Sequence, residues 1–436
     1  MSGEVVKALL EKGTVILLID GLDLLSVNAE FDPYIKISNF IAKFYNSRYV
    51  ISSRPGFFDR LDKYNFKIFE IEELDEKKVE SFVDRYVGNG EIAKVIKKEI
   101  ANNENISLYK NPLMLFLAMN VAVSRIEEDT ILPSTYTELY DYFIESLFTH
   151  YYEKGQKLRA DKIQILNVAK HLFFNLQTQN EIRCKREYAI EIAETKSKIS
   201  GLYDAMGIDV LNDLCNLGLL EEDVGYFKFG IHQSFQEYFA AIMLKDLYEI
   251  GINISASFVH PKWEKVLIFT SEMVKDSDSF VQHIIDEGEL LLASKCSHNA
   301  SNSQKEKLAL LLHKSLFSLK FNQQKSDLIE GLKFLQNIGK PFLLKLLKCD
   351  DSAIVRCAAK ALGDLNSKEA VESLIELLNN PDEGIVWNAA DALGKIGSEK
   401  AVEPLIKLFS HNNEELSWSI SEILEKIYSE KKVACL

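Results

Sequence analysis

The tripeptide Ala361-Leu362-Gly363 recurs further along the chain as Ala392-Leu393-Gly394. The offset between the two copies is 31 residues (392 − 361), and the same offset relates Leu374-Ile375 to Leu405-Ile406. A period of about 30 residues is typical of a repeated pair of short helices. Because one pair cannot bury its apolar face alone, successive pairs must stack on one another. The sequence therefore predicts an α-solenoid over residues 326–432.

Two tryptophans, Trp387 and Trp418, are separated by the same offset. They are either stacked between helices or exposed to a partner, since aromatic side chains are enriched at binding hot spots; we interpret them as core residues. We expect a glycine between the two helices of each pair. The leucines expected to face inward are Leu374, Leu377, Leu378, Leu393, Leu405 and Leu408. The repeat resembles the short HEAT repeats of the phycobilisome-lyase type.

The composition limits the class of protein. The chain has 436 residues, which is enough for two to four domains, and a net charge of −14. This acidic balance argues against a nucleic-acid partner, which needs clustered basic residues. No apolar run is as long as a membrane span requires. The six cysteines form no C-x-x-C pair, which is typical of reduced thiols in a cytoplasmic protein.

A second informative segment, Thr14-Val-Ile-Leu-Leu-Ile-Asp20-Gly-Leu-Asp23, lies near the N-terminus. An apolar run that ends in carboxylates predicts a buried central strand with a site at its C-terminal end. Residues Ile37–Tyr45 predict a helix, and residues Arg48–Ser53 and Phe66–Ile71 predict two more strands. Alternation of strand and helix indicates a parallel sheet.

The pattern becomes helical from Leu74 onward. Pro112 follows Asn111 and predicts a helix start, where the missing N–H of proline costs nothing. Residues Thr135–His150 predict an amphipathic helix. A helix over Val210–Leu220, a turn and a strand over Tyr226–Phe229 predict a small helical module closed by a β-wing.

Four residues are candidates for chemistry, each with a simpler alternative. Asp20 and Asp23 could hold Mg²⁺ and position a water molecule, or could belong to an ordinary Asp-Gly turn. Arg54 could reach a phosphate in the crevice at the strand ends; taken alone, an exposed arginine before a turn is the better interpretation. His232 could contact a phosphate, although a hydrogen-bonded core histidine is the better interpretation on chemistry alone.

The order of these pieces resembles the NACHT class of signal-transduction NTPases. The blocks that carry the resemblance are Asp20-Gly21-Leu22-Asp23, Ser53-Arg54-Pro55, Asn111-Pro112-Leu113, Leu132-Pro133 with Glu138-Leu139-Tyr140, and Phe229-Gly-Ile-His232-Gln-Ser-Phe-Gln-Glu-Tyr-Phe239. They occur in the family's order over residues 14–244. The resemblance implies a regulatory switch that ADP keeps closed and ATP opens, with Mg²⁺, in defence or stress signalling.

The resemblance also implies roles for individual residues. Asp20 would hold the magnesium ion, and Asp23 would act as the catalytic carboxylate beside the attacking water. Arg54 would sense the terminal phosphate, Pro112 would contact the base, and His232 would hold ADP in the closed state.

Two departures from the family pattern lead us to expect weak nucleotide binding and slow hydrolysis at most. Leu24 stands where the family usually has a glutamate. No G-x-x-x-x-G-K-[ST] phosphate loop occurs in the short segment that precedes Thr14. The chain would then be either a piece of a longer protein or a degenerate member of the family.

The sequence thus predicts a predominantly α protein with an α/β remnant of a P-loop NTPase core. The predicted domains are the partial NTPase core at 1–72, a helical domain at 73–133, a winged-helix region at 134–244, a helical linker at 245–325 and the HEAT-like repeats at 326–432. The predicted function is a cytoplasmic, nucleotide-dependent switch, with a protein partner on the repeats and self-association through the NTPase region. The alternatives are a non-catalytic scaffold built on the repeats and, ranked last, a lyase-type enzyme.

Overall fold

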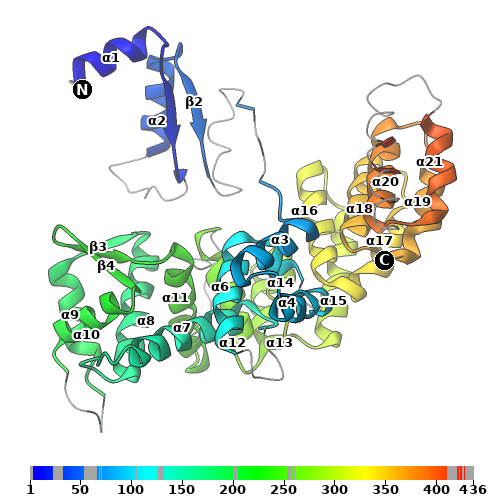
Figure 1. Ribbon diagram of the computed structural model, residues 1–436. Helices are drawn as coiled ribbons and strands as arrows, with labels where there is room; N and C mark the ends of the chain where they lie inside the picture. Colours follow the sequence, from blue (N-terminus) through cyan, green and yellow to red (C-terminus); the bar gives the residue numbers. More distant parts are fainter. Residues whose placement is uncertain are drawn as a thin grey trace. The chain divides into compact units, whose positions relative to one another are not determined.

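The computed structural model describes residues 3–22, 33–53, 66–67, 69, 71–103, 106–125, 132–199, 202, 205–252, 258, 261–409, 420–421, 423–424 and 427. The chain divides into two compact units. The first is Met1–Gly251 with His260–Phe269, and the second is Ile252–Val259 with Thr270–Leu436. Helices dominate both units, as predicted (Figure 1).

The first unit begins with a small α/β element. It consists of α1 (Gly3–Glu11), β1 (Ile16–Ile19), α2 (Pro33–Lys43) and β2 (Arg48–Ile51). The two strands are parallel, with Ile16 opposite Arg48 and Ile19 opposite Ile51. The predicted strand–helix–strand order is confirmed for these residues (Figure 1).

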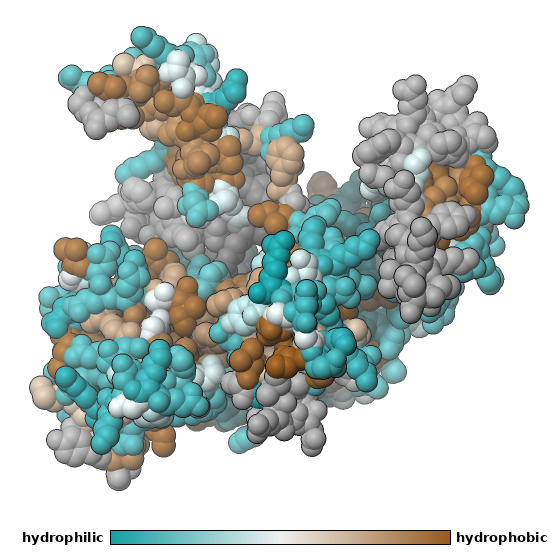
Figure 2. Space-filling view, viewed as in Figure 1, coloured by the Kyte–Doolittle hydropathy of each residue, from teal (hydrophilic) through white to brown (hydrophobic). Residues whose placement is uncertain are grey.

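The prediction of a buried central strand is wrong. Alternate residues of both strands are exposed, and Leu18 has 76% of its surface in contact with solvent. Figure 2 shows apolar side chains at the surface of this part of the chain. The strands are therefore covered on one face only.

The third predicted strand, Phe66–Ile71, is also not observed where that segment is described. Residues 66, 67, 69 and 71 are not in a strand, and the side chain of Ile71 is 96% exposed. Phe66 instead packs against a cluster formed by Leu22 and Tyr34. The apolar contact that Phe66 gains in this cluster does not require strand pairing.

The next part of the first unit is helical, as predicted. Its helices are α3 (Glu76–Val87), α4 (Glu91–Asn102), α5 (Ser107–Lys110), α6 (Pro112–Ser124) and α7 (Tyr136–Glu153). Asn111 caps α6 by accepting hydrogen bonds from the backbone N–H groups of Leu113 and Met114, and the Thr135 side chain caps α7 by accepting one from the N–H of Glu138. The predicted helix starts at Pro112 and after Thr135 are confirmed.

Residues 162–249 form a helical module with a small antiparallel sheet. The elements are α8 (Lys162–Gln179), β3 (Arg183–Lys185), α9 (Arg186–Lys196), α10 (Gly207–Asn216), β4 (Leu220–Asp223), β5 (Tyr226–Phe229) and α11 (Gln233–Glu249). The strand order is β3-β5-β4. Phe227 of β5 is fully buried, and Phe239 of α11 stacks on Phe173 of α8. The expected strand over Tyr226–Phe229 is therefore present.

The short helix η4 (Pro261–Trp263) belongs to the first unit, and α12 (Glu264–Met273) crosses the division. The second unit continues with α13 (Ser277–Asp286), α14 (Leu290–Lys295), α15 (Asn302–Leu316), α16 (Asn322–Phe334), α17 (Gln336–Leu346), α18 (Ser352–Asp364), η5 (Lys368–Ala370), α19 (Val371–Leu377), α20 (Glu383–Ile396), η6 (Glu399–Ala401) and α21 (Val402–Phe409). Within the repeats, α18 packs against both α16 and α20.

The repeated leucines form much of the expected core. Leu374, Leu393 and Leu405 are fully buried and Leu378 is nearly so, whereas Leu377 and Leu408 are half-buried. The position predicted for the repeated glycines is wrong, because Gly363 lies inside α18 and Gly394 lies inside α20.

The core interpretation of the tryptophans is also wrong where it can be checked. The side chain of Trp387 is 49% exposed, and Trp418 lies outside the described residues.

The domain boundaries expected at 72, 133, 244 and 325 stay predictions.

Candidate functional site

The C-terminal ends of β1 and β2 are tied together by Ser52. Its hydroxyl group donates a hydrogen bond to the carboxylate of Asp20 and accepts one of 2.9 Å from the backbone N–H of Gly21. The backbone N–H of Leu22 donates to the carbonyl oxygen of Ser52 over 3.0 Å. The start of the loop after β1 is thereby fixed, and the carboxylate of Asp20 is held at the strand ends.

The rest of the predicted magnesium and phosphate site cannot be placed against Asp20, because Asp23 and Arg54 lie outside the described residues. Across the residues that are described, no group of three or more His, Cys, Asp or Glu side chains is arranged to hold a metal ion. The roles of Asp20, Asp23 and Arg54 stay predictions.

His232 is the N-cap residue of α11. Its Nδ1 atom accepts a 3.1 Å hydrogen bond from the backbone N–H of Ser234 and lies 2.8 Å from the hydroxyl oxygen of that residue. The residue is exposed, so the interpretation as a core histidine is wrong. Because Nδ1 acts as an acceptor, the proton of the neutral ring is on Nε2.

Pro112 is the first residue of α6 and is exposed. Asp20, Pro112 and His232 thus stand at the ends of three different elements: the end of β1 and the starts of α6 and α11. Polar or conformationally restricted residues are common at such positions for local reasons alone. The structure places Pro112 and His232 at helix starts, and their nucleotide contacts stay predictions.

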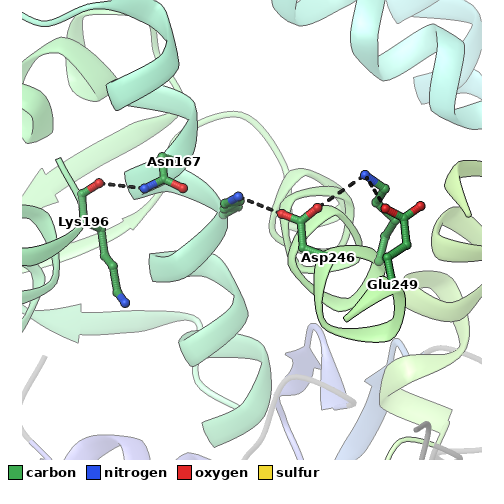
Figure 3. A network of polar contacts seen from close by, with 6 residues as sticks. Asn167, Lys196, Asp246 and Glu249 are labelled. Carbon is green, nitrogen blue, oxygen red and sulfur yellow. Dashed lines mark hydrogen bonds and ion pairs between the residues drawn. The ribbon is translucent and has the colours of Figure 1, made fainter. Parts of the chain in front are cut away.

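A polar network joins α8, α9 and α11 (Figure 3). The side-chain amide of Asn167 donates to the carbonyl oxygen of Lys196 over 2.7 Å. Asp246 pairs with Lys170 over 2.7 Å and with Lys245 over 3.3 Å, and Lys245 also reaches Glu249. These contacts link one helix to the next or brace α11 itself, so we interpret this network as structural.

Asp246 of this network and the nearby His171 both have altered pKa values. Burial opposes ionisation of Asp246, but hydrogen bonds from Lys170 and Lys245 hold the pKa of this carboxyl below its ordinary value. Burial, with the nearby charges of Lys196 and Lys170, lowers the pKa of His171 to about 4. His171 is therefore neutral at pH 7.

The repeats carry a second polar pattern. Asp351 caps α18 and Asp382 caps α20, each by accepting hydrogen bonds from two backbone N–H groups of the helix that it starts. Lys325 of α16 forms a 2.5 Å ion pair with Asp351. A hydrogen bond from Ser352, together with the charge of Arg356 on α18, lowers the pKa of Asp382. Lys325 thus pairs with the capping carboxylate of the next helix of this row, and the charge of Arg356 favours the ionised form of the capping carboxylate after it.

Trp387 occupies the next position of the same row. Lys325, Arg356 and Trp387 follow one another at the spacing of the repeat, on α16, α18 and α20. The cation is thus replaced by a half-exposed indole. This row was not predicted, although the sequence carries a signal for it in the spacing of Lys325, Arg356 and the two capping aspartates.

Comparisons with known proteins support the repeats. Residues 340–435 match the family model for HEAT repeats. This part of the chain carries HEAT repeats. The match leaves the rest of the chain unassigned, and the finer likeness to phycobilisome-lyase repeats stays a prediction.

Two crystal structures of engineered proteins from the Northeast Structural Genomics Consortium are similar in part. One is 21% identical, with 45% of this chain and 90% of that chain covered and a TM-score of 0.22. The other is 14% identical, with 81% and 99% covered and a TM-score of 0.26.

No curated protein matches the chain. The resemblance of residues 14–244 to NACHT NTPases has no counterpart among these findings and stays a prediction. None of the described helices is both long enough and apolar enough to cross a membrane.

Proposed function

We propose that this chain is a non-catalytic scaffold whose HEAT repeats bind a protein partner. The observation that carries the proposal is the exposure of Trp387 in a row whose earlier members are cations that interact with capping carboxylates. HEAT repeats form extended surfaces that suit protein partners, because each repeat adds one more row of exposed side chains.

Trp387 is the best anchor for such a partner among the described repeat residues. Lys325 is already paired with a capping carboxylate, and the charge of Arg356 lowers the pKa of another, whereas the indole of Trp387 keeps about half of its surface in water. Tryptophan is strongly enriched among the residues that dominate binding energy at protein interfaces. Its burial by a partner would recover the hydrophobic free energy that the isolated chain forgoes.

The test is the effect of Trp387→Ala on partner binding. Proteins cross-linked to the full chain in its source cells are quantified by mass spectrometry for the wild type, for Trp387→Ala and for Tyr152→Ala. Tyr152 is a similarly exposed aromatic residue of the first unit and serves as the matched control. We expect the same proteins with wild type and Tyr152→Ala, and their loss with Trp387→Ala. Equal recovery with Trp387→Ala would refute the proposal.

A second candidate function is the nucleotide-dependent switch that the NACHT resemblance implies. Two observations favour it: the parallel β1–β2 pair with Asp20 held at its C-terminal end, and the order helix–strand–helix–helix–strand–strand in residues 162–229, which is the order of a winged-helix domain. ADP and Mg²⁺ would bind near Asp20, Arg54, Pro112 and His232.

Calorimetry with ADP and Mg²⁺ tests this candidate. We expect weak binding, because this sequence contains no phosphate loop, and a further loss with His232→Ala. His232→Asn keeps the helix cap and is the control for folding. Binding at micromolar affinity or better, lost in both variants, would instead support an intact switch.

A further inference from the structure

One segment of this acidic chain is rich in lysine and poor in carboxylates. Residues 291–349 contain ten lysines and three carboxylates, although the whole chain has a net charge of −14. A strong local charge of opposite sign to the rest of the chain is typical of a surface that binds a charged partner. The segment covers α15, α16 and α17 of the second unit.

Part of this charge lies beside a row of rings at the C-terminal end of α15 and on α17. The ring of His313 packs against Phe317 and against Phe342, with 5.4 Å between ring centroids in both cases. Lys345 lies over the Phe342 ring, with its Nζ atom 5.6 Å from the centroid. Lys314 is exposed and precedes Phe317 by one turn of α15. We call these five residues the basic–aromatic face.

The face is open in the isolated chain. Phe317 is 60% exposed, and Lys314 and Lys345 are both exposed. Within the described part of the chain, neither lysine takes part in a salt bridge, whereas Lys325 and Lys333 nearby are paired with carboxylates. The exposed ring of Phe317 beside two lysines without ion pairs combines the two features of a binding surface, apolar area and a single sign of charge.

We propose that the basic–aromatic face binds an acidic protein segment that also carries apolar side chains. This inference rests on the proposed scaffold function and names the chemistry of one partner. Carboxylates of the partner would lie against Lys314 and Lys345, and its apolar side chains would cover Phe317.

A protein segment fits the face better than single-stranded nucleic acid. Nucleic-acid bases need free ring faces on which to stack. Here the His313 and Phe317 planes meet at 69°, and Lys345 occupies a face of Phe342. Residues 291–349 also contain no arginine, the residue whose planar fork best matches phosphate groups.

Fluorescence anisotropy with the full chain tests the inference. The probe is a labelled peptide made of four Glu-Glu-Phe-Glu-Leu units. Its counterpart with lysine in place of glutamate and an oligouridylate of matched length are the comparison probes. We expect only the glutamate peptide to bind, and its affinity to fall as salt is raised from about 50 to 300 mM, because screening shortens the range of the attraction.

Two sets of variants locate the site. We expect the double variant with Lys314→Glu and Lys345→Glu to weaken peptide binding by at least about tenfold, which corresponds to a loss of about 1.4 kcal/mol in binding free energy. We expect Phe317→Ala to weaken it by about fivefold. The control is the double reversal Lys360→Glu with Lys368→Glu, two exposed lysines of the same unit outside the face, for which we expect less than about a twofold change.

The inference is overturned if the glutamate peptide does not bind, if the control reversal weakens binding as much, or if oligouridylate binds more tightly. These outcomes are distinct from failure of the scaffold proposal. Loss of partners in Trp387→Ala would still support a scaffold, even if the peptide did not bind to the basic–aromatic face.

Discussion

Gly363 of α18 lies so close to Ala392 of α20 that a Cβ atom on the glycine would stand 2.7 Å from the Cα atom of Ala392. Gly394, one repeat later, has the same relationship to Ile423, whose nearest side-chain atom would be 2.8 Å away. The repeated tripeptide therefore marks the point where helices of successive repeats make a close approach. Glycine is required there for space, and not to end a helix.

Substitution of this glycine should loosen the repeat stack. Gly363→Ala gains helix propensity of up to about 1 kcal/mol, but the added methyl group must push α18 and α20 apart, which typically costs about 1–3 kcal/mol. We expect faster hydrogen exchange in both helices. Gly90→Ala is the control, because a Cβ atom there meets nothing within 4 Å. Equal exchange in the two variants would contradict this interpretation of the tripeptide.

Truncation of a buried repeat leucine should have a local effect. Leu393 is fully buried, and Leu→Ala at such sites costs about 2–5 kcal/mol. Because each repeat depends on its neighbours, we expect Leu393→Ala to raise hydrogen exchange in α18–α21 and to leave residues 3–240 unchanged. Leu377→Ala, at a half-buried site, should have a smaller effect. A uniform rise in hydrogen exchange over the whole chain in Leu393→Ala would argue against independent units.

The hairpin between β4 and β5 contains a residue under backbone strain. Val224 has a φ angle of +34°, is 92% exposed and precedes Gly225 at +80°. Such turns favour Asn-Gly, and a β-branched residue at positive φ is costly. We expect Val224→Asn to stabilise the hairpin by about 1 kcal/mol and Gly225→Ala to destabilise it. Thermal unfolding and exchange of β5 measure both; a lower melting temperature for Val224→Asn would show that the valine makes a compensating contact.

The capping carboxylates should make the repeats sensitive to acid. The hydrogen bond from Lys325 holds the pKa of Asp351 below its ordinary value of 3.8. A lowered folded-state pKa means that the stabilisation is complete above the unfolded pKa and is lost as the pH falls through the folded pKa. We expect Asp351→Asn, which can still cap α18, to be less stable than wild type at pH 7 and to lose less stability as the pH is lowered toward 3. The free energy of unfolding is measured by urea titration at each pH. If it varied with pH in the same way in Asp351→Asn and in wild type, the stabilising role of the ion pair would be contradicted.

The sequence predicted the repeats well because their period marks equivalent positions directly. It did not reveal which face those positions occupy, so Trp387 was assigned to the core. A glycine near the end of a helical pattern is compatible with both a helix end and close helix packing, which explains the error at Gly363. Helix starts at Pro112 and after Thr135 were predictable, because capping depends on residues a few positions apart.

The N-terminal β1–β2 element was predicted less well. The burial of its strand residues depends on which segments, distant in sequence, pack against the sheet. The apolar run of β1 indicated a strand, but periodicity alone cannot show how many faces of a sheet are covered, and Leu18 is exposed. Asp20 was placed correctly at a strand end, and its bond with Ser52 was not foreseen. The capping role of His232 depends on the direction of one ring nitrogen, which no spacing reveals.

The measurement that most directly tests the scaffold function is partner binding by the purified chain with and without ADP and Mg²⁺. A partner recovered by cross-linking is titrated by calorimetry against the wild type and Trp387→Ala. We predict that Trp387→Ala weakens binding by at least about tenfold and that nucleotide changes the affinity by less than about twofold. Binding that is unaffected by Trp387→Ala but depends on ADP would contradict the scaffold and favour the nucleotide switch.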